Sequence, residues 1–147
     1  MVDDRVDFGI LIGLAFQAFV DEMHADLAAR GFGDLGRSYG FVFRVLGDGD
    51  RSLSELARLL GMTLPGAGKI VDEMERRRYV ERRPDRVDRR VKHIGLSRRG
   101  RAALAAARAF HRDFEARLPD SSGLRRGLEA LAGQTTGEPL PVYLRPL

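Results

Sequence analysis

The middle of this chain reads SLSELARLLG (52–61), MT (62–63), LPGAGKIVDEMERRRYV (64–80) and ERRPDRVDRRVKHIGLSRRG (81–100). The apolar spacing predicts two short helices joined by a tight turn, followed by an arginine-rich β-hairpin. A helix pair of this spacing can place its second helix in a DNA major groove, and the hairpin can reach the neighbouring backbone or minor groove. The stretch therefore predicts a DNA-binding protein rather than an enzyme.

Capping residues mark where these two helices begin and end. Ser52 or Ser54 can cap the first helix, Ser52 with Glu55 three residues later is a capping-box pattern, and Gly61 stops that helix. Thr63 is a good N-cap for the second helix, with Pro65 near its first turn. The helix pair is thus specified by local chemistry as well as by its apolar rows.

The hairpin is predicted from two strands, Val80–Pro84 and Val91–Leu96, with its tip at 85–90. Charge gathers around it, because residues 76–101 hold twelve Arg or Lys against three acids, whereas the rest of the chain is net acidic. A basic segment in an otherwise acidic chain is typical of polyanion binding, although most charge runs are solvated faces. We favour polyanion binding here because the run coincides with the hairpin.

Helices are expected on both sides of this segment. An apolar stripe at i, i+3, i+4 spacing predicts one long helix over 4–30, and a largely buried helix follows at 35–46. Ser97 caps a fifth helix over about 98–118, and a short sixth helix covers 122–132. The predicted fold class is mostly α, an α+β winged helix with about six helices and a two- to three-stranded β wing. The broad stripe on the first helix is expected to face both its own core and a partner chain.

Composition excludes several classes of protein. Cysteine is absent, which excludes disulfide scaffolds, thiolate metal sites and thiol-based redox sensing in this chain. No uninterrupted apolar run reaches about 18 residues, so no membrane span is expected. The chain starts with Asp3, Asp4 and Asp7 rather than with the basic residues of a signal peptide. We therefore expect a cytoplasmic protein with no membrane partner.

Catalytic and metal chemistry has little support in the sequence. PGAGK at 65–69 resembles the end of a P-loop, but Thr63 and Ile70 stand where glycine and Ser or Thr are required. No nucleophile–base–acid set is suggested by spacing, so we expect no catalytic residues, no metal and no cofactor. The three histidines share no ligand spacing and are interpreted as interface or surface residues: His24, His93 and His111.

The wing carries a spaced motif made by Asp88, Arg90, Leu96, Ser97 and Gly100. It resembles the signature Asp-x-Arg-x5-Leu-Thr-x2-Gly of the MarR family of winged-helix transcriptional regulators, with serine keeping the hydroxyl N-cap. The preceding VDEMERRRYVERR is similar to the end of that family's recognition helix and its first wing strand. The specific match covers residues 52–104, and the flanking helices agree in length and order.

The resemblance implies a homodimer in which each subunit offers one winged helix to half of a palindromic duplex DNA site. We expect the proline-rich tail at 134–147 to pack across the dimer partner or to lie over a ligand cleft, and the alternative is simple fraying of this end. The implied organisation is an N-terminal dimerisation helix (1–34), a winged helix-turn-helix DNA-binding domain (35–100), C-terminal dimerisation helices (101–133) and a proline-rich tail (134–147).

The resemblance also implies roles for the wing. In the family, the arginine matching Arg90 enters the minor groove, and the acid matching Asp88 orients wing side chains. Arg86 and Arg89 are expected to flank Arg90 at the tip. Other basic side chains of the wing are expected to meet phosphates, which set affinity but carry little sequence information. The expected DNA-binding residues are Thr63, Gly66, Ala67, Lys69, Arg82, Arg83, Arg86, Asp88, Arg89, Arg90 and Lys92.

Two positions depart from the family pattern. Residues 64–69 read LPGAGK where relatives usually carry Ser, Thr, Arg or Gln, so hydrogen-bonded base readout is left to Thr63 and Lys69. Such small residues permit close approach with apolar contacts to thymine methyls, or equally indicate weak specificity. Arg78 replaces the usual glycine before the wing, and a left-handed backbone there costs an arginine about 1 kcal/mol.

Members of this family often bind small aromatic or phenolic anions in a cleft between the dimerisation helices and the winged helix. Candidate cleft residues are Phe16, Tyr39, Phe43 and Arg44, and the alternative is that they are plain core packing. We expect a sequence-specific DNA-binding transcriptional regulator, a repressor relieved by such a ligand. Two alternatives stay open: a winged-helix protein–protein interaction module, and an architectural DNA binder of low specificity.

Overall fold

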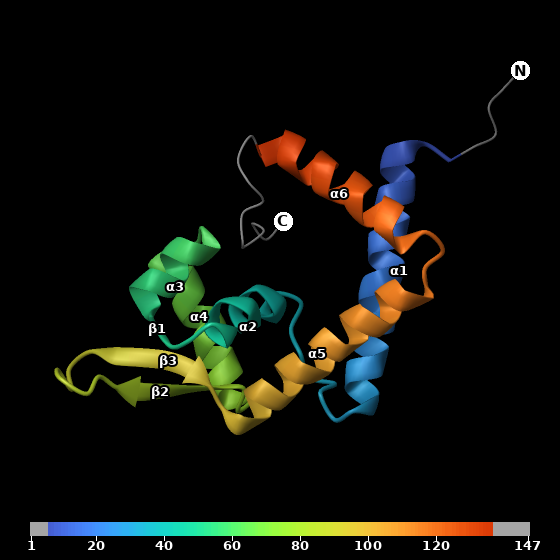
Figure 1. Ribbon diagram of the computed structural model, residues 1–147. Coiled ribbons are helices and arrows are strands. Elements are labelled where there is room, and N and C mark those ends of the chain that lie inside the picture. Colours follow the sequence, from blue (N-terminus) through green and yellow to red (C-terminus); the bar gives the residue numbers. More distant parts are fainter. Residues whose placement is uncertain (1–5, 137–147) are drawn as a thin grey trace, which may run out of the picture. The chain divides into compact units, whose positions relative to one another are not determined.

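The computed structural model describes residues 6–136, which form helices and one small sheet (Figure 1). The chain divides into two compact units that meet in sequence between Leu35 and Gly36, so α1 is described by itself. The elements in chain order are α1 (Phe8–Ala29), α2 (Tyr39–Gly47), β1 (Arg51–Ser52), α3 (Leu53–Leu60), α4 (Leu64–Arg76), β2 (Val80–Pro84), β3 (Lys92–Leu96), α5 (Arg98–Arg117) and α6 (Ser121–Thr136).

The sheet has three antiparallel strands in the order β1-β3-β2. The hairpin register pairs Val80 with Leu96 and Pro84 with Lys92, and Arg51 of β1 pairs with Ile94 on the other side of β3. The β2–β3 hairpin extends beyond the helices of its unit (Figure 1). The winged-helix fold class with its two- to three-stranded wing is therefore confirmed.

The helix ends follow the caps expected from the sequence. Glu55 N donates to the Ser52 side chain at 3.2 Å, and Ser52 N donates to the Glu55 carboxylate at 3.1 Å, which completes a capping box at the start of α3. Gly61 ends α3 with a left-handed φ of 64°. Thr63 Oγ1 accepts from Gly66 N at 3.2 Å and caps α4. Local chemistry thus fixes the lengths of both helices.

The turn between α4 and β2 is built on Arg78, whose φ of 64° is left-handed. Tyr79 N donates to Met74 O at 2.8 Å, and Arg78 N donates to Glu75 O at 2.9 Å. These two bonds form a Schellman motif, in which the left-handed position is usually glycine. Arg78, which replaces the glycine usual in the family, therefore does adopt the left-handed backbone.

Three boundaries differ from the predictions. The second helix begins at Tyr39 rather than at 35, because the Tyr39 ring lies against Gly36, whose carbonyl accepts from Tyr39 N. α1 begins at Phe8, and residues 1–5 lie outside the described part. α6 continues to Thr136, so residues 134–136 are helix rather than tail. The proposed docking of the tail concerns 137–147, which lie outside the described residues.

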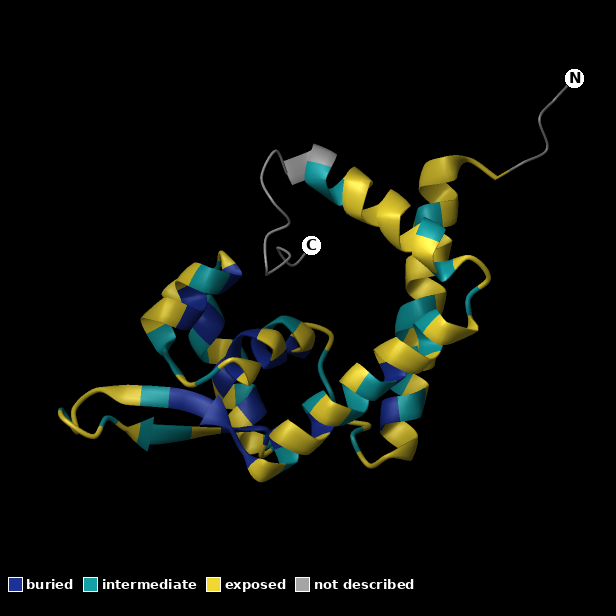
Figure 2. Cartoon of the chain, viewed as in Figure 1, coloured by how far each residue is buried: buried dark blue, intermediate teal, exposed yellow. Residues whose placement is uncertain are grey.

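The core of the second unit lies between α2, α3, α4, α5 and the sheet, and Figure 2 shows it as the dark-blue region. Tyr79 is fully buried at its centre, with edge-on contacts to the rings of Tyr39 and Phe43 at centroid distances of 6.1 and 5.6 Å. The Arg99 guanidinium lies 4.3 Å from the centroid of the Tyr79 ring. These contacts hold the C-terminal end of α4 against α2 and α5.

Gly100 lies where α5 passes closest to the end of α4. A Cβ atom at this position would overlap the Tyr79 carbonyl oxygen. Beside it, Ser97 caps α5 by accepting from Gly100 N at 3.0 Å, and its hydroxyl donates to Arg78 O at 2.5 Å. The serine and glycine of the wing motif are thus explained by one tight junction between α4 and α5.

α1 is long and apolar enough to cross a membrane when it is judged by length and composition alone, with a mean hydropathy of 1.2. The sequence-based expectation counted only uninterrupted apolar runs, and Gln17, Asp21 and Glu22 interrupt this one. A mostly buried core helix of a soluble protein and a signal sequence pass the same test, and none of the apolar window of α1 is buried within the described structure. One helix of this kind is weak evidence for a membrane span.

Candidate nucleic-acid interface

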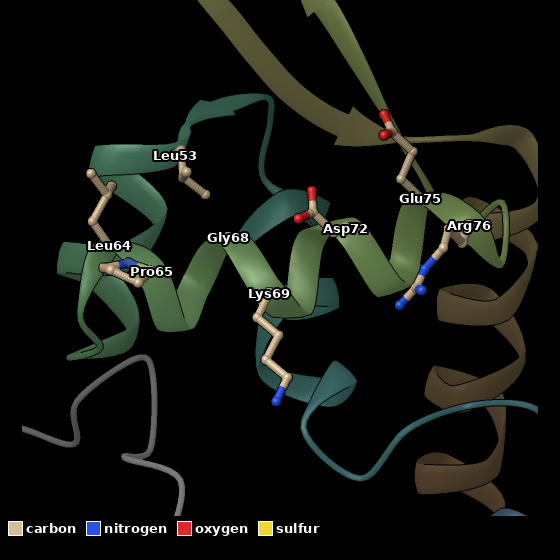
Figure 3. A pocket seen from close by; sticks show the side chains of 8 residues that line it. All are labelled: Leu53, Leu64, Pro65, Gly68, Lys69, Asp72, Glu75 and Arg76. Atoms are coloured by element: carbon tan, nitrogen blue, oxygen red, sulfur yellow. The ribbon is translucent and has the colours of Figure 1, made fainter.

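The outer face of α4 forms a shallow groove of about 820 Å³. The opposite face of the helix is buried through Val71 and Met74, so the two faces have separate roles. Figure 3 shows the groove: Leu53 and Leu64 lie together at its N-terminal end, and charged side chains project on both sides farther along. The lining residues are Leu53, Leu64, Pro65, Gly68, Lys69, Asp72, Glu75 and Arg76.

The four DNA-binding residues expected on α4 differ in where the structure places them. Lys69 is exposed on the outer face, and Thr63 is exposed at the N-terminus of the helix. Gly66 is half-buried beneath the Thr63 cap. Ala67 is 1% exposed and lies in the core, so its methyl group cannot reach a base. Its place among the expected DNA-binding side chains is corrected accordingly.

Arg82 of β2 joins the wing to the outer face of α4. Its Nη2 lies 2.6 Å from Asp72 Oδ1 and its Nη1 lies 2.7 Å from Glu75 Oε1. Burial lowers the pKa of Arg82, but the hydrogen bonds and charges of these two carboxylates raise it above its ordinary value. One guanidinium therefore holds two acids that project from the recognition helix.

Arg83 makes a second set of contacts at the base of the wing. Its guanidinium lies 3.0 Å from Asp50 Oδ2 and 2.9 Å from Glu81 Oε2, and it donates to Leu96 O at 3.0 Å. The turn before β1 is thereby tied to the hairpin. Arg82 and Arg83 were expected to contact phosphates. In the structure, their guanidinium groups instead donate to carboxylates and a carbonyl of the protein itself.

Two aspartates organise the tip of the wing. Asp85 accepts from the backbone N–H groups of Val87 and Asp88, both at 2.9 Å, and lies 2.8 Å from His93 Nε2. The Asp88 and Val87 amides and His93 lower the pKa of Asp85 to about 2, with the Asp88 amide as the largest cause. The turn is therefore held by an ionised carboxylate throughout the neutral range.

Asp88 holds the side chain of Arg90. It accepts from Arg90 N at 3.0 Å and from Arg90 Nε and Nη2 at 3.0 and 3.1 Å. The hydrogen bond to the Arg90 side chain is the first cause of a lowered pKa at Asp88. The side chain of Arg90 is 92% exposed, so Asp88 fixes its direction while leaving the guanidinium open to solvent.

Further cations surround Arg90 at the tip. Arg86, Arg89 and Lys92 are exposed, and no described residue forms an ion pair with them. A hairpin end with several unpaired cations beside an arginine held by Asp88 suits a phosphate backbone flanking a narrow groove. The structure thus brings together the exposed face of α4 and a cationic wing within one unit.

The comparisons with known proteins agree with this geometry. A model of the MarR family matches residues 34–91, which span α2 to the wing tip. Residues 34–91 of this chain are thus similar to the MarR family. That family consists of DNA-binding transcriptional regulators that are not enzymes. No curated protein matches the sequence.

Solved MarR-type structures share the fold along nearly their whole length. Streptococcus pneumoniae FabT in complex with DNA is 22% identical, with a TM-score of 0.66 over 89% of this chain and 99% of FabT. The heme sensor PefR from Streptococcus agalactiae, in complex with heme, is 16% identical, with a TM-score of 0.61 over 90% and 95%. A probable transcriptional regulator from Pseudomonas aeruginosa is 29% identical, with a TM-score of 0.52 over 88% and 98%.

The residues expected to line a MarR effector cleft occupy different environments. Tyr39 and Phe43 are 2% and 6% exposed and pack on Tyr79, as the core-packing alternative predicts. Arg44 is exposed on α2, and Phe16 is exposed on α1 in the other unit. Within the described residues, no group of three or more His, Asp or Glu side chains is placed to hold a metal ion.

Sequence reasoning missed the acidic partners of the MarR wing. Asp72 and Glu75 lie three residues apart on the exposed side of α4, and that spacing is a signal that a cation bridges them. Asp50 lies 33 residues from Arg83, and no local pattern joins the two. The sequence predicts His93 only as an interface or surface residue, and in the structure it forms part of the wing tip through Asp85.

Proposed function

We propose that this regulator binds a palindromic operator as a homodimer and represses transcription until a small aromatic or anionic effector binds. The observation that carries the proposal is the wing tip, where Asp88 presents an exposed Arg90 among unpaired cations. The outer face of α4 is exposed in the same unit and is free to enter a major groove. The DNA complex of FabT supports this mode of binding.

A second copy of the chain is the proposed cover for the exposed apolar side chains of the terminal helices. Leu124, Leu128 and Leu131 form one stripe on α6 and are 47%, 50% and 40% exposed. Phe8 and Phe16 of α1 are also exposed. Each apolar square ångström buried contributes about 25 cal/mol, so such stripes favour association. We assign dimerisation to 1–34 and 101–133, DNA binding to 35–100, and a cytoplasmic location.

The effector is proposed at the level of chemical class. The heme complex of PefR shows that a relative on this fold takes a small-molecule ligand. In this chain Phe16 and Arg44 are the exposed members of the candidate set, one aromatic and one cationic. An aromatic carboxylate such as salicylate is therefore the first probe, and it should lower operator affinity if it stabilises a dimer geometry that fits the operator less well.

Selection from a random duplex pool at about 150 mM salt tests the DNA-binding proposal directly. We expect a palindrome with half-sites about one helical turn apart. Salt-sensitive binding without an enriched sequence would favour an architectural role, which the apolar LPGAGK start of α4 also suits. No binding to any duplex would favour a protein–protein interaction module.

Arg90→Ala tests the wing in the same assay. It should weaken binding to every duplex, lower the salt slope by about one, and flatten any preference for narrow A·T minor grooves. Analytical ultracentrifugation tests the dimer, and a monomer at micromolar concentration would contradict the palindromic mode.

A further inference from the structure

The N-terminal half of the α4 groove is apolar. It is lined by Leu53, Leu64, Pro65 and Gly68 (Figure 3). Leu64 is the first residue of α4, and half of this apolar side chain (50%) is exposed to solvent. The Thr63 hydroxyl is turned to its own helix, where it accepts from Gly66 N. Lys69 is thus the only charged side chain in the first two turns of this face.

Among the described residues 6–136, no close contact requires glycine at position 68. A Cβ there would meet only Leu53 Cδ2, at an ordinary contact distance of 3.7 Å, and its backbone is not left-handed. Glycine in a helix interior nevertheless costs about 1 kcal/mol relative to alanine. Gly66 differs, because a Cβ there would lie 3.0 Å from Thr63 Oγ1 and crowd the cap. Because Gly68 has no side chain, the outer face of α4 is hollowed there, beside Leu53 and Leu64. We call this hollow the dent at Gly68.

The charges around this dent fit duplex DNA. Lys69 and Arg76 project from the groove on one side, whereas Asp72 and Glu75 point to the other side, where Arg82 holds both carboxylates (Figure 3). The cationic wing belongs to the same unit. In the major groove of a duplex, the pyrimidine C5-methyl is the apolar group on a base edge.

We propose that Leu64 and the dent at Gly68 read a pyrimidine C5-methyl group, so that this helix recognises a methyl rather than a hydrogen-bond pattern at one position of each half-site. The inference rests on the proposed DNA-binding function. Thymine carries this methyl, and 5-methylcytosine carries the same group at the same place. The protein therefore distinguishes methylated from unmethylated cytosine wherever that position holds a C·G pair.

Removal of single methyl groups from DNA tests the inference. The probe is a 25–30-bp duplex of the selected palindrome in which each thymine is replaced in turn by deoxyuridine, with fluorescence anisotropy at about 150 mM salt. Burial of one methyl predicts about a fourfold loss per half-site and about fifteenfold when both half-sites are changed. Cytosine at the sensitive position should bind weakly, and 5-methylcytosine should restore most of the affinity.

Three variants of the full chain complete the test. Leu64→Ala should bind the thymine and deoxyuridine duplexes equally, and Gly68→Ala, which fills the dent and favours the helix, should reduce the discrimination. Lys69→Ala is the matched control, because it should weaken both duplexes and leave their ratio unchanged.

Deoxyuridine duplexes that bind the wild type as well as thymine duplexes would overturn methyl reading while leaving the proposed DNA binding intact. Salt-sensitive binding with no selected sequence would overturn it as well. No binding to any duplex would overturn both proposals.

Discussion

Arg82 offers a way to separate a structural clamp from a phosphate contact. Arg82→Gln removes the cation that lies 2.6 Å from Asp72 and 2.7 Å from Glu75. The pairs are partly exposed, with 27% of the Arg82 side chain and 63% of the Asp72 side chain open to solvent. Such pairs contribute about 0.2–1 kcal/mol each, so the free energy of unfolding should fall by about 1 kcal/mol. For a domain of this size, Tm then falls by roughly 3 °C.

The effect on DNA affinity should be larger than this loss of stability implies, because two carboxylates become unneutralised on the face of α4 that is proposed to meet DNA. In water, a carboxylate about 7 Å from a phosphate is repelled by roughly 0.6 kcal/mol. Two such repulsions amount to about 1.2 kcal/mol, or about an eightfold rise in Kd per half-site. Fluorescence anisotropy on one operator duplex, with Tm measured by circular dichroism, gives both quantities.

Removal of the two acids provides the decisive control. If Arg82 acts as a clamp, the triple variant Arg82→Gln, Asp72→Asn, Glu75→Gln should recover most of the lost affinity, because no charge remains to repel the backbone. If Arg82 itself contacts a phosphate, the triple variant stays weak and the salt slope falls by about one. That second result would refute the clamp.

Three further predictions concern the turn, the junction and the wing tip. Arg78→Gly should raise the free energy of unfolding by up to about 1 kcal/mol in urea denaturation, since φ is 64° there; a loss of stability would contradict the strain. Gly100→Ala should cost about 1–3 kcal/mol because Cβ meets the Tyr79 carbonyl, whereas Gly127→Ala, with open space, should be neutral or stabilising. Because the pKa of Asp85 is lowered to about 2, its contribution to tip stability is complete above its usual pKa and is lost as pH falls through about 2. The protection factors of the tip amides, which correct exchange rates for their intrinsic pH dependence, should therefore fall below about pH 4 in the wild type and should be low at every pH in Asp85→Asn.

The parts of the structure that were predictable from sequence are those set by neighbours along the chain. Ser52, Thr63 and Ser97 cap their helices through groups three residues away, and each cap forms as predicted. Arg90 meets Asp88 two residues away, and both belong to the spaced wing motif seen in the sequence. Spacing of two to four residues is fixed by helix and turn geometry, so the sequence pattern carries these contacts directly.

The parts that were not predictable depend on tertiary placement. Asp72 and Asp50 reach Arg82 and Arg83 across 10 and 33 residues, and the distances follow only from how the wing folds back on the helices. Ala67 lies in the first turns of α4, which the sequence predicts to face DNA. Which way its side chain points depends on the rotation of α4 about its own axis, and in the structure it points into the core. β1 has two residues and is defined only by its pairing with β3, so no strand pattern of its own could identify it.

The tight junction at Gly100 joins the end of α4 to the start of α5, so that the two helices are expected to move together as one rigid body. The Ser97 hydroxyl donates to the Arg78 carbonyl, and the Gly100 backbone lies directly against Tyr79. The Arg99 guanidinium lies over the Tyr79 ring and donates to the Arg77 carbonyl. These contacts leave little room for the two helices to move relative to each other at this junction. α5 has 20 residues and is about 30 Å long. A tilt of about 5° imposed at its far end would therefore swing the recognition helix by a similar angle without any contact near the DNA, and would change the spacing of the two reading helices in a dimer. The contact between Gly100 and Tyr79 would thus pass a movement of the far end of α5 to α4, and the spacing of the two recognition helices in a dimer would change.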